Sequence, residues 1–531
     1  MNKRLHLNRG FVLPSASVRW MIVALVILAV ALAVFVWQAL RPSTPSVPAP
    51  DYWPTNGWRT AAPESHGFDS AIMAEGLRAM RRDGTKIHSL MVVHAGEVIL
   101  DAYFYPYDGS TVHDQASVTK SFMTTLIAIA ADQGKLDLDA PILSFFPDRE
   151  IANRDARKER ITVRHLTSNT AGWECIHHPE EPTARDMHAS PDWVQFTLDL
   201  PMVAEPSTTF AYCSPGMHLL SAILEKATGM NTLEFARANL FEPLGIHDVV
   251  WSTDPQGTPN GHGELYLHPH DTAKLGLLWL HGGQWDGQQI VSREWVEASS
   301  KLQISTGPNY GADYGYGWWI ARPGDDPTFK ADGRGGQLVL VFPAMDLVLV
   351  TTGGGFELDD VDDYLVAAIG KTNPLPDNPA GVADLQAALD EVAQPLAAQP
   401  VLPLPDMAQV ISGHTYLFDD NPYRLASLRL DFDQTAEASL SLTYYGDMHD
   451  RQGFVGLDGQ YRFSQAWEGS REFTQGLRGA WTDAQTFVLY YNEIASPNAM
   501  MLNVHFDGEH VTLEGPSPER EGTVSVEGWQ E

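Results

Sequence analysis

Positive charge and cysteine are both scarce in this 531-residue chain. Lys and Arg number 35 against 67 Asp and Glu, which gives a net charge of −32. A polyanion gains nothing from releasing the counterions of DNA, so this balance argues against nucleic-acid binding. The two cysteines, Cys175 and Cys213, are too few for a disulfide framework. They could pair in an oxidising compartment, but two buried free thiols are the default expectation.

Several catalytic motifs are missing as well. The chain has no Gly-x-Ser-x-Gly and no His-Glu-x-x-His, and the phosphate-loop-like ending at 370–372 has Leu365 where a glycine is required. The histidines at 177–178 and at 268 and 270 do not match a known ligand spacing, so we interpret them as structural or surface residues. We therefore expect no metal and no organic cofactor.

One long apolar run lies near the N-terminus. Residues 20–40, WMIVALVILAVALAVFVWQAL, carry no charge. As a helix they would span about 31 Å, which matches a hydrocarbon core of about 30 Å. Basic residues are more frequent before the run (Lys3, Arg4, Arg9 and Arg19) than after it (Arg41). The positive-inside rule then predicts a cytoplasmic segment 1–19, a transmembrane anchor 20–40 and an extracytoplasmic remainder, periplasmic or on the outer face.

A cleaved signal peptide is the alternative for this run. Its apolar region should be shorter, with a small-x-small site after it, whereas the Ala31-Leu32-Ala33 match lies inside the run. We favour an uncleaved anchor, and both interpretations export the rest of the chain.

The remaining sequence divides into four parts by composition and hydrophobic pattern. Residues 41–59 begin with the Pro-rich stretch RPSTPSVPAP and are typical of a stiff tether. Residues 60–370 form a mixed region, 371–405 are a Pro- and Ala-rich linker with one possible short helix, and 406–531 form a second domain.

The mixed region predicts an α+β fold. Apolar runs at 90–100 and 338–350 have the pattern of strand pairs, and helical patterns at 117–133, 217–229 and 267–283 lie between them. Strands at both ends with helices between predict an antiparallel sheet closed by the two ends of the region, flanked by helices, with a helical region inserted.

The C-terminal part has strand periodicity. Residues 439–445 alternate apolar and polar side chains, and the stretches 454–463 and 501–515 do so around Asp458-Gly459 and Asp507-Gly508. Asp-Gly between alternating runs is a strong hairpin signal, so we expect a small all-β barrel.

Two residues in HDQASVTKSF (113–122) suggest a catalytic function. Ser117 and Lys120 are three apart, which on a helix places them on one face with Cβ atoms about 5–6 Å apart. A desolvated lysine can hold its amine neutral and accept the serine proton. Such a site also needs a proton relay and an oxyanion hole, for which Tyr212-Cys213-Ser214 and the glycine-rich 333–337, GRGGQ, are candidates.

The order of these three motifs resembles the serine β-lactamase and penicillin-binding-protein superfamily. More narrowly it is similar to the class C-related hydrolases, which include esterases, D-aminopeptidases and 6-aminohexanoate-dimer hydrolases. The sequence is also similar to that family at 163–174, 210–230, 240–246, 263–297 and 314–320, so the resemblance covers roughly 60–370. The C-terminal domain resembles lipocalin-like modules, more weakly.

The resemblance implies a role for each matching residue. Ser117 would be the acylated nucleophile, Lys120 its proton acceptor and Tyr212 a second base that serves the leaving group and the water. The backbone N–H groups of Ser117 and Gln337 would form the oxyanion hole. Substrate-binding positions would be Ser214, Arg334, Gly335 and Gly336.

Three positions depart from that family's pattern. Ser214 stands where an asparagine is usual, and Arg334-Gly335-Gly336 replaces Lys-Thr-Gly. Arg334 has a planar fork that suits a carboxylate, although a solvated arginine at a strand edge is an equal alternative. Asn169 replaces a histidine that many relatives have. If residues 212–214 are extended, Cys213 points away from its two neighbours and is a packed residue rather than a nucleophile.

The sequence thus predicts an exported, membrane-anchored serine hydrolase that cleaves an ester or amide bond of a small molecule or short peptide. One alternative is a D-Ala-D-Ala-type carboxypeptidase or β-lactamase that acts on cell-wall peptides or β-lactams. A second alternative, of another class, is a receptor or scaffold that binds a ligand without turnover. The physiological substrate and the oligomeric state cannot be predicted from the sequence.

Overall fold

The computed structural model describes residues 50–531, except 179–180, 309, 323–327, 359–360, 434–435, 447–449, 469–470 and 518–521. The predicted cytoplasmic segment and anchor, residues 1–40, lie outside the described residues. Among the helices of the described part, none is both long and apolar enough to cross a bilayer.

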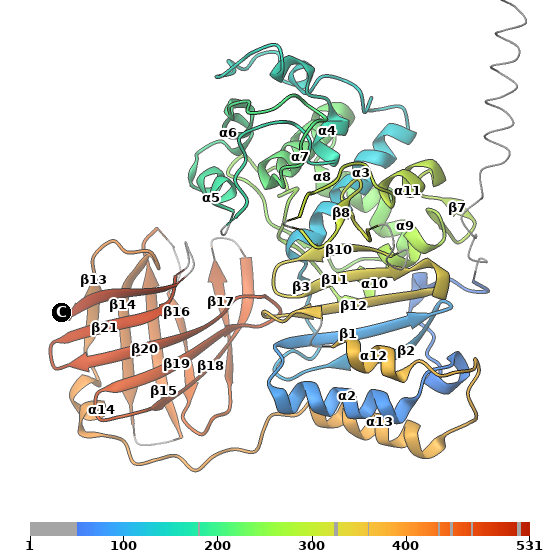
Figure 1. Ribbon diagram of the computed structural model, residues 1–531. Helices are drawn as coiled ribbons and strands as arrows, with labels where there is room; N and C mark the ends of the chain where they lie inside the picture. Colours follow the sequence, from blue (N-terminus) through green and yellow to red (C-terminus); the bar gives the residue numbers. More distant parts are fainter. Residues whose placement is uncertain are drawn as a thin grey trace, which may run out of the picture. The chain divides into compact units, whose positions relative to one another are not determined.

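A seven-stranded sheet forms the centre of the hydrolase domain (Figure 1). Its strands, in spatial order, are β2 (Glu97–Tyr103), β1 (Ile87–His94), β12 (Leu347–Gly353), β11 (Gln337–Phe342), β10 (Phe329–Gly333), β9 (Trp319–Ile320) and β8 (Asp313–Tyr314). All neighbouring pairs are antiparallel, and β1 pairs with β12 across more than 240 residues of chain. The predicted sheet closed by the two ends of the domain is confirmed.

Both faces of this sheet are buried. Successive residues of β1 contribute to different cores, because side chains of a strand alternate between faces: Val92 packs with α2 (Ser70–Asp83) and α13 (Pro379–Val392), and Val93 belongs to the core that includes α10 (Pro269–Leu280). Figure 1 shows α2 and α13 together on one side of the sheet with α12 (Asp362–Ala368).

Helix α13 lies inside the stretch predicted as a linker. Its Leu385 and Ala388 are buried in the core beneath the sheet, and Asp384 and Glu391 form ion pairs with Arg78 of α2. The hydrolase domain therefore extends to about residue 392, and the connection to the second domain is shorter than the predicted linker.

The inserted helical region lies on the other side of the sheet. It contains the short strands β3 (His113–Asp114), β4 (Val250–Trp251), β5 (Leu265–Leu267), β6 (Gln284–Trp285) and β7 (Gln288–Gln289). Its helices, besides α10, are α3 (Thr119–Asp132), α4 (Val163–Thr167), α5 (Pro182–Ala189), α6 (Trp193–Asp199), α7 (Ser214–Thr228), α8 (Thr232–Ala236), α9 (Glu242–Leu244) and α11 (Arg293–Ser299). The three predicted helices correspond to α3, α7 and α10. Helix α3 is buried from Thr119 to Ala130, as expected for a helix that is apolar on most sides.

Among the described residues, the C-terminal domain is a ten-stranded sheet with its own core, preceded by α14 (Asp406–Ile411), and nine of these strands close into a barrel. Its strands are β13 (Thr415–Phe418), β14 (Leu425–Phe432), β15 (Glu437–Tyr444), β16 (Arg451–Gly456), β17 (Arg462–Glu468), β18 (Arg471–Trp481), β19 (Thr486–Glu493), β20 (Ala499–Asp507), β21 (His510–Pro516) and β22 (Thr523–Gln530). The predicted barrel and the hairpin at Asp507-Gly508 are confirmed.

The two strands on either side of Asp458-Gly459 do not pair with each other as a hairpin, contrary to the prediction. Strand β16 pairs with β15, and β17 pairs with β18. A parallel contact between Gly456 of β16 and Arg478 of β18 closes the barrel instead. The chain does reverse direction at Asp458-Gly459. The two strands that this turn joins pair with other strands, however, because the barrel closes at this point.

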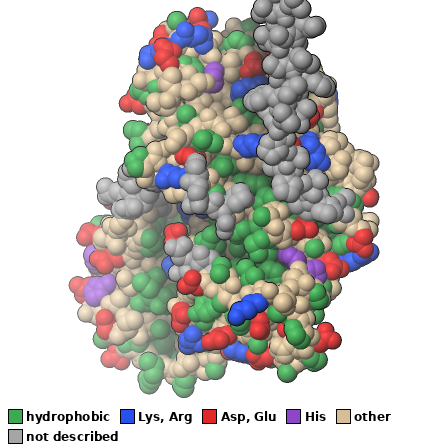
Figure 2. Space-filling model, turned by 45° about the vertical axis from the view of Figure 1, so that its right-hand side comes forward, with side chains coloured by type: hydrophobic (Ala, Val, Ile, Leu, Met, Phe, Trp, Pro, Cys, Tyr) green, Lys and Arg blue, Asp and Glu red, His purple; other side chains and the backbone are tan. Residues whose placement is uncertain are grey.

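Charged side chains of both signs are interspersed with apolar ones on the face that Figure 2 shows. No continuous basic patch covers that face.

Candidate active site

The nucleophile candidate lies on a constrained turn between β3 and α3. The carboxylate of Asp114 accepts a hydrogen bond from the backbone N–H of Ala116 at 2.8 Å, and Ala116 has φ of +44°. A left-handed conformation at a non-glycine residue costs free energy and persists only when its surroundings impose it. Ser117 follows in a 3₁₀ turn, Ala116–Val118, that leads directly into α3.

Lys120 lies one helical turn beyond Ser117, as predicted. Its Nζ donates to Ser117 Oγ at 2.7 Å and to the carbonyl oxygen of His262 at 2.8 Å. The side chain is almost completely buried, and this burial lowers the pKa of Lys120 to about 8, although the nearby carboxylate of Glu181 acts in the opposite direction. A usable fraction of the amine is therefore neutral near physiological pH and can accept the serine proton.

Tyr212 completes a three-residue cluster. Its ring centroid is 4.9 Å from Lys120 Nζ, and its hydroxyl is hydrogen-bonded to Ser117. Burial raises the pKa of Tyr212 well above its usual value, and Tyr314 and Glu181 raise it further. Tyr212 is therefore a neutral phenol at physiological pH, which suits the proton shuttle that the family resemblance implies.

Asn169 holds the Tyr212 segment in place. Its side-chain oxygen accepts from the backbone N–H of Cys213 at 3.0 Å, and its carbonyl accepts from the N–H of Ala211 at 2.9 Å. Asn169 itself is buried with φ of +56°, a conformation that asparagine tolerates better than most residues. Asn169 thus anchors the segment that carries the tyrosine.

The two predicted oxyanion-hole residues face each other across Gly333. A Cβ atom at Gly333 would lie 3.0 Å from the backbone nitrogen of Ser117 and 3.1 Å from Cβ of Gln337. The side chain of Gln337 donates to the carbonyls of Arg334 and Gly353 at 2.9 and 2.8 Å, which fixes the start of β11. The close approach at Gly333 thus brings the backbone of Ser117 and the backbone of Gln337 to the same place.

The turn between β10 and β11 requires glycine. Gly335 and Gly336 have φ of +89° and +91°, in a region that side chains rarely adopt. A Cβ atom on Gly336 would approach the ring of Phe356 to 2.3 Å. Arg334, the third predicted substrate-binding residue of this turn, is exposed and donates to the side-chain oxygen of Asn498 at 3.1 Å.

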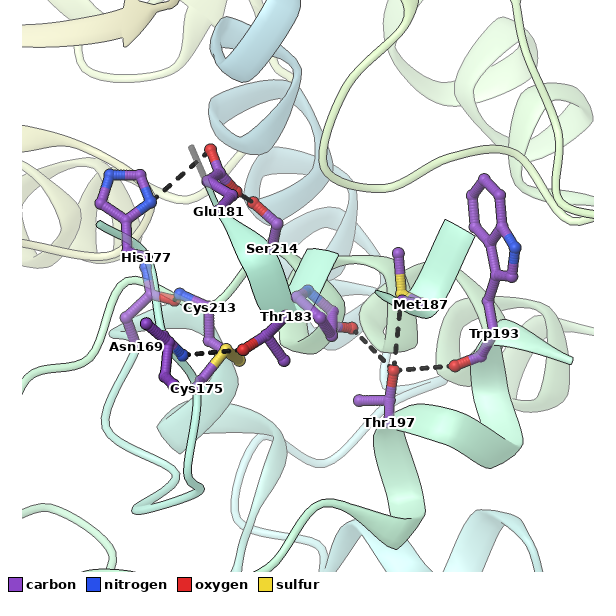
Figure 3. Close-up of a disulfide and its surroundings, with 12 residues drawn as sticks. Asn169, Cys175, His177, Glu181, Thr183, Met187, Trp193, Thr197, Cys213 and Ser214 are labelled. Atoms are coloured by element: carbon purple, nitrogen blue, oxygen red, sulfur yellow. Dashed lines mark hydrogen bonds and ion pairs between the residues drawn. A yellow bond between two sulfur atoms is a disulfide. The ribbon is translucent and has the colours of Figure 1, made fainter. Parts of the chain in front are cut away.

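Glu181 is a site residue that the sequence motifs did not indicate. Its carboxylate accepts a hydrogen bond from the hydroxyl of Ser214 and lies 3.6 Å from Nδ1 of His177 (Figure 3). Burial alone would raise the pKa of Glu181, but Lys120, Ser214 and His177 together hold it below its usual value. A carboxylate therefore lies beside the Ser117–Lys120 pair. Glu181 belongs to no recognisable motif, and only the fold brings it there.

A disulfide ties the Glu181 loop to the tyrosine segment. Cys175 and Cys213 are bonded, with Cα atoms 5.6 Å apart (Figure 3). The expectation of two free thiols is therefore wrong: the chain reversal that places residue 175 beside α7 could not be read from two cysteines 38 residues apart. The prediction that Cys213 is a packed residue rather than a nucleophile holds, because its sulfur is bonded.

Aromatic rings surround the far side of Tyr212. Trp319 stacks on it with centroids 5.6 Å apart, His177 approaches to 4.6 Å, and Tyr310 lies 5.6 Å from Trp319. His177 is therefore a site residue, not a surface one. Burial lowers the pKa of His177 to about 4, so its imidazole is neutral and adds to this apolar wall. In the part of the chain that the structure describes, no group of three or more ligating side chains is placed to hold a metal.

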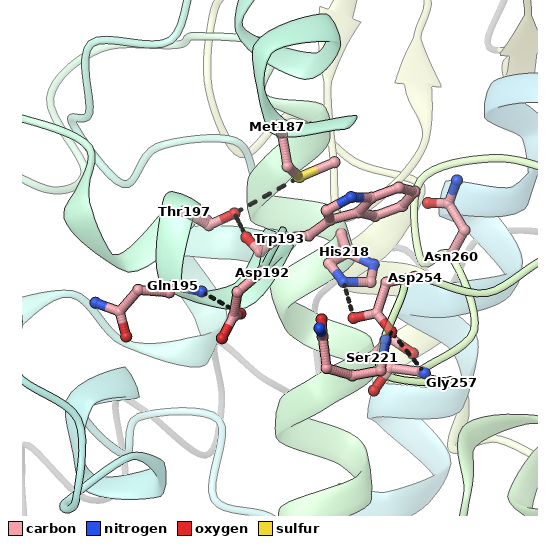
Figure 4. A network of polar contacts seen from close by, with 12 residues as sticks. Met187, Asp192, Trp193, Gln195, Thr197, His218, Ser221, Asp254, Gly257 and Asn260 are labelled. Atoms are coloured by element: carbon pink, nitrogen blue, oxygen red, sulfur yellow. Dashed lines mark hydrogen bonds and ion pairs between the residues drawn. The ribbon is translucent and has the colours of Figure 1, made fainter. Parts of the chain in front are cut away.

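A second polar network, which includes His218, Asp254 and Asn260 (Figure 4), supports the loop whose His262 carbonyl contacts Lys120. His218 of α7 and Asp254 are completely buried and lie 3.2 Å apart. Asp254 accepts from the backbone N–H of Thr258 at 2.9 Å, and the side-chain oxygen of Asn260 accepts from the N–H of His262 at 3.2 Å. These bonds fix the carbonyl of His262, which accepts a hydrogen bond from the Lys120 amine.

Fold and site together define a hydrolase of the penicillin-binding type, with a serine on the 3₁₀ turn that leads into α3, a lysine in the first turn of α3 and a tyrosine just before α7. The chain matches the family model described as Beta-lactamase over residues 77–371, more than half its length. The chain belongs to this family and is a serine hydrolase at the level that the family defines.

Individual relatives are distant. Penicillin-binding protein 4 of Amycolatopsis lactamdurans is 25% identical over 284 residues, 46% of this chain and 73% of the relative. The 6-aminohexanoate-dimer hydrolase of Paenarthrobacter ureafaciens is 24% identical over 299 residues, 51% of this chain and 73% of the relative. Among solved structures, the octameric penicillin-binding protein homologue of Pyrococcus abyssi is 17% identical with a TM-score of 0.47, and the match covers 86% of this chain and 99% of that one.

The pH dependence of hydrolysis follows from the lysine. We expect kcat/KM for an ester to rise with pH and level off above an apparent pKa near 8, because only the neutral amine accepts the serine proton. Glu181→Gln keeps an oxygen acceptor for Ser214 but removes the negative charge that raises the pKa of Lys120, so its profile should shift to lower pH. A pH–rate series for both proteins tests this. An unshifted Glu181→Gln profile would contradict the assigned electrostatics.

Proposed function

We propose that this protein hydrolyses an ester or amide bond of a small substrate through an acyl-enzyme on Ser117. The observation that carries the proposal is the 2.7 Å contact between Ser117 Oγ and the nearly fully buried amine of Lys120, whose pKa is lowered to about 8. Strongly shifted pKa values cluster at functional sites, so a buried lysine with a lowered pKa beside a hydroxyl favours a catalytic role over a purely structural one.

The reaction begins with attack by Ser117 Oγ on the substrate carbonyl carbon while its proton passes to Lys120 Nζ. The tetrahedral oxyanion accepts hydrogen bonds from the backbone N–H groups of Ser117 and Gln337. The proton then moves through the neutral hydroxyl of Tyr212 to the leaving group as the carbon–leaving-group bond breaks. In the second half, water loses a proton to the same relay and attacks the acyl carbon, which releases the acid and restores Ser117.

The substrate is held by groups around this centre. Gly335 and Gly336 let the substrate approach the strand edge closely, Ser214 presents its hydroxyl through the contact with Glu181, and Arg334 offers its guanidinium to a carboxylate. The single hydroxyl of Ser214 is already donated to Glu181, so it is a weak ligand for a substrate amide. This favours esters and simple amides over β-lactams.

We place this reaction outside the cytoplasm, with the chain anchored by residues 20–40. Two observations support this location: the apolar run with its basic N-terminal flank, and the Cys175–Cys213 disulfide, since structural disulfides persist in oxidising compartments.

A cell-wall carboxypeptidase or β-lactamase is the second candidate, and the relatives named penicillin-binding protein favour it. Faster turnover of a D-Ala-D-Ala peptide or a β-lactam than of simple esters would establish it. A non-catalytic receptor is the third possibility. The intact Ser117, Lys120 and Tyr212 cluster counts against it, because a receptor has no need of a lysine amine held partly neutral.

A pre-steady-state burst tests the proposal. Full-length protein mixed with p-nitrophenyl butyrate should release one equivalent of p-nitrophenol rapidly and then turn over slowly, because deacylation follows acylation. Ser117→Ala should abolish the burst. Ser144→Ala, which removes an exposed hydroxyl bonded only to the local backbone carbonyl of Pro141, is the matched control and should keep it. A burst that survives in Ser117→Ala would refute the assigned nucleophile.

A further inference from the structure

We propose that a turn of the C-terminal barrel is part of the active site, and that Asn498 in this turn is a positioning residue for Arg334. The turn comprises residues 494–498 and joins β19 to β20. This inference rests on the proposed function and deepens it: the barrel would set the preference of the enzyme for substrates that carry a carboxylate.

The burial of this turn is the first observation. Turns at the end of a barrel normally face solvent, because their backbone groups need water as a partner. Here Ala495 is 4% exposed and Ser496 is 2% exposed, and Pro497 is buried too. Something other than the barrel covers them.

The covering surface is the active-site edge of the hydrolase domain. The carbonyl of Ala495 accepts a hydrogen bond from the backbone N–H of Asp114 at 2.9 Å, three residues before Ser117. On the other side, a Cβ atom on Gly335 would lie 2.7 Å from Cβ of Pro497. The turn therefore contacts both the segment that presents the nucleophile and the glycine turn that leads to Gln337.

The third contact concerns Arg334. Its Nη2 donates to the side-chain oxygen of Asn498 at 3.1 Å. An exposed arginine has many rotamers, and an acceptor on a rigid turn removes most of that freedom before substrate arrives. Arg334 also acts electrostatically on Asp114, whose pKa burial raises to about 7, so the guanidinium lies near the nucleophile segment.

The turn itself is rigid enough for this task. Ala495 has φ of +66°, and the N–H of Asn498 donates to the hydroxyl of Ser496 at 3.2 Å. The backbone N–H of Glu493 closes the turn on the carbonyl of Asn498 at 3.2 Å, and the N–H of Ile494 donates to the carbonyl of Thr474 on β18 at 2.9 Å. A left-handed alanine is tolerated where the surroundings impose it, and here both domains do so.

Further contacts hold the barrel in this position against the hydrolase domain. The guanidinium of Arg471 lies 5.1 Å from the ring centroid of Tyr266 in β5, and Tyr105 packs against Tyr461 and Phe463 with centroids 6.2 Å away in each case. Contacts of this kind at several points fix an interface better than one flexible bridge. The position of Asn498 is thus set by the barrel as a whole.

The chemistry that this arrangement recognises is a carboxylate. A guanidinium whose fork is held in place binds a carboxylate oxygen pair with little further loss of entropy. In a substrate, this carboxylate would lie on the β10–β11 side of the scissile carbonyl.

Two esters that differ only in a terminal carboxylate test the inference. The full-length protein is assayed with p-nitrophenyl hexanoate and with mono-p-nitrophenyl adipate, and the readout is the ratio of their kcat/KM values. Asn498→Ala should lower the adipate-to-hexanoate ratio about fivefold to tenfold, because a freed Arg334 binds the carboxylate less well. Asn498→Asp keeps an acceptor oxygen and should retain most of the preference. Asn503→Ala, the same substitution further along β20, is the matched control and should leave the ratio unchanged.

A double-mutant cycle separates positioning from mere support of the fold. Arg334→Ala should lower the ratio about tenfold, and Arg334→Ala with Asn498→Ala should lower it no further, because the asparagine acts only through the arginine. An unchanged ratio in Asn498→Ala, an equal loss for both esters, or additive effects would overturn the inference. Wild-type protein that hydrolyses neither ester would instead refute the proposed function itself, and the two failures are distinct.

Discussion

Lys120→Arg is expected to lower kcat/KM for p-nitrophenyl butyrate by about 100- to 10,000-fold, the range typical for loss of a general base. The guanidinium keeps the positive charge but does not lose its proton at any accessible pH. The lysine amine, by contrast, is held near neutrality by burial and lies 2.7 Å from Ser117 Oγ. The loss should therefore appear at every pH, without the rise near pH 8 that the wild type shows.

A second substitution distinguishes the base from the charge. Lys120→Met is neutral and similar in shape, and it should be as inactive as Lys120→Arg if the proton acceptor is what matters. Lys301→Arg makes the same change at an exposed lysine and should be fully active. Thermal unfolding of each variant shows that the protein is folded. Activity above a tenth of the wild-type value in Lys120→Met would contradict the assigned role.

Gly333→Ala is expected to lower kcat about 100-fold with a smaller effect on folding. A Cβ atom here would lie 2.8 Å from the carbonyl oxygen of Gln115 and 3.0 Å from the backbone nitrogen of Ser117. Both are backbone atoms that cannot rotate away, so the nucleophile segment must move relative to β10 and Gln337. A displacement of about 1 Å between reacting groups is enough to cost about 100-fold in rate.

The control for this change is a glycine without neighbours. Gly311→Ala adds a Cβ atom where nothing lies within 4 Å, and it should leave the kinetics unchanged. Single-turnover acylation measures the step that the oxyanion hole serves. If Gly333→Ala acylates at the wild-type rate, the N–H groups of Ser117 and Gln337 do not act together on the oxyanion.

The parts of this site that the sequence predicts are those with local geometry. Ser117 and Lys120 lie one helical turn apart, as helix periodicity predicts, and the glycines at 335 and 336 precede a strand that its apolar run predicts. The three motifs lie far apart in sequence, however, and the family resemblance was needed to expect them in one site.

The parts that the sequence does not predict depend on tertiary contacts. Glu181 lies in a loop that the Cys175–Cys213 disulfide links to the tyrosine segment. The spacing of the two cysteines matches no motif that would predict this link. The contact of Asn498 with Arg334 joins residues 164 positions apart in two domains. Such pairs leave no periodic signal in a single sequence. The rise of the Tyr212 pKa above its usual value likewise follows from burial, which only the fold determines.

The central claim is that Ser117 forms a covalent acyl-enzyme. The most direct measurement is the intact mass of full-length protein mixed with p-nitrophenyl acetate and quenched in acid, followed by mass mapping of its peptides. The account predicts an increase by one acetyl group, located on the peptide that contains Ser117 and missing in Ser117→Ala. Turnover of the ester with no adduct in the wild type, or an adduct on another residue, would contradict it.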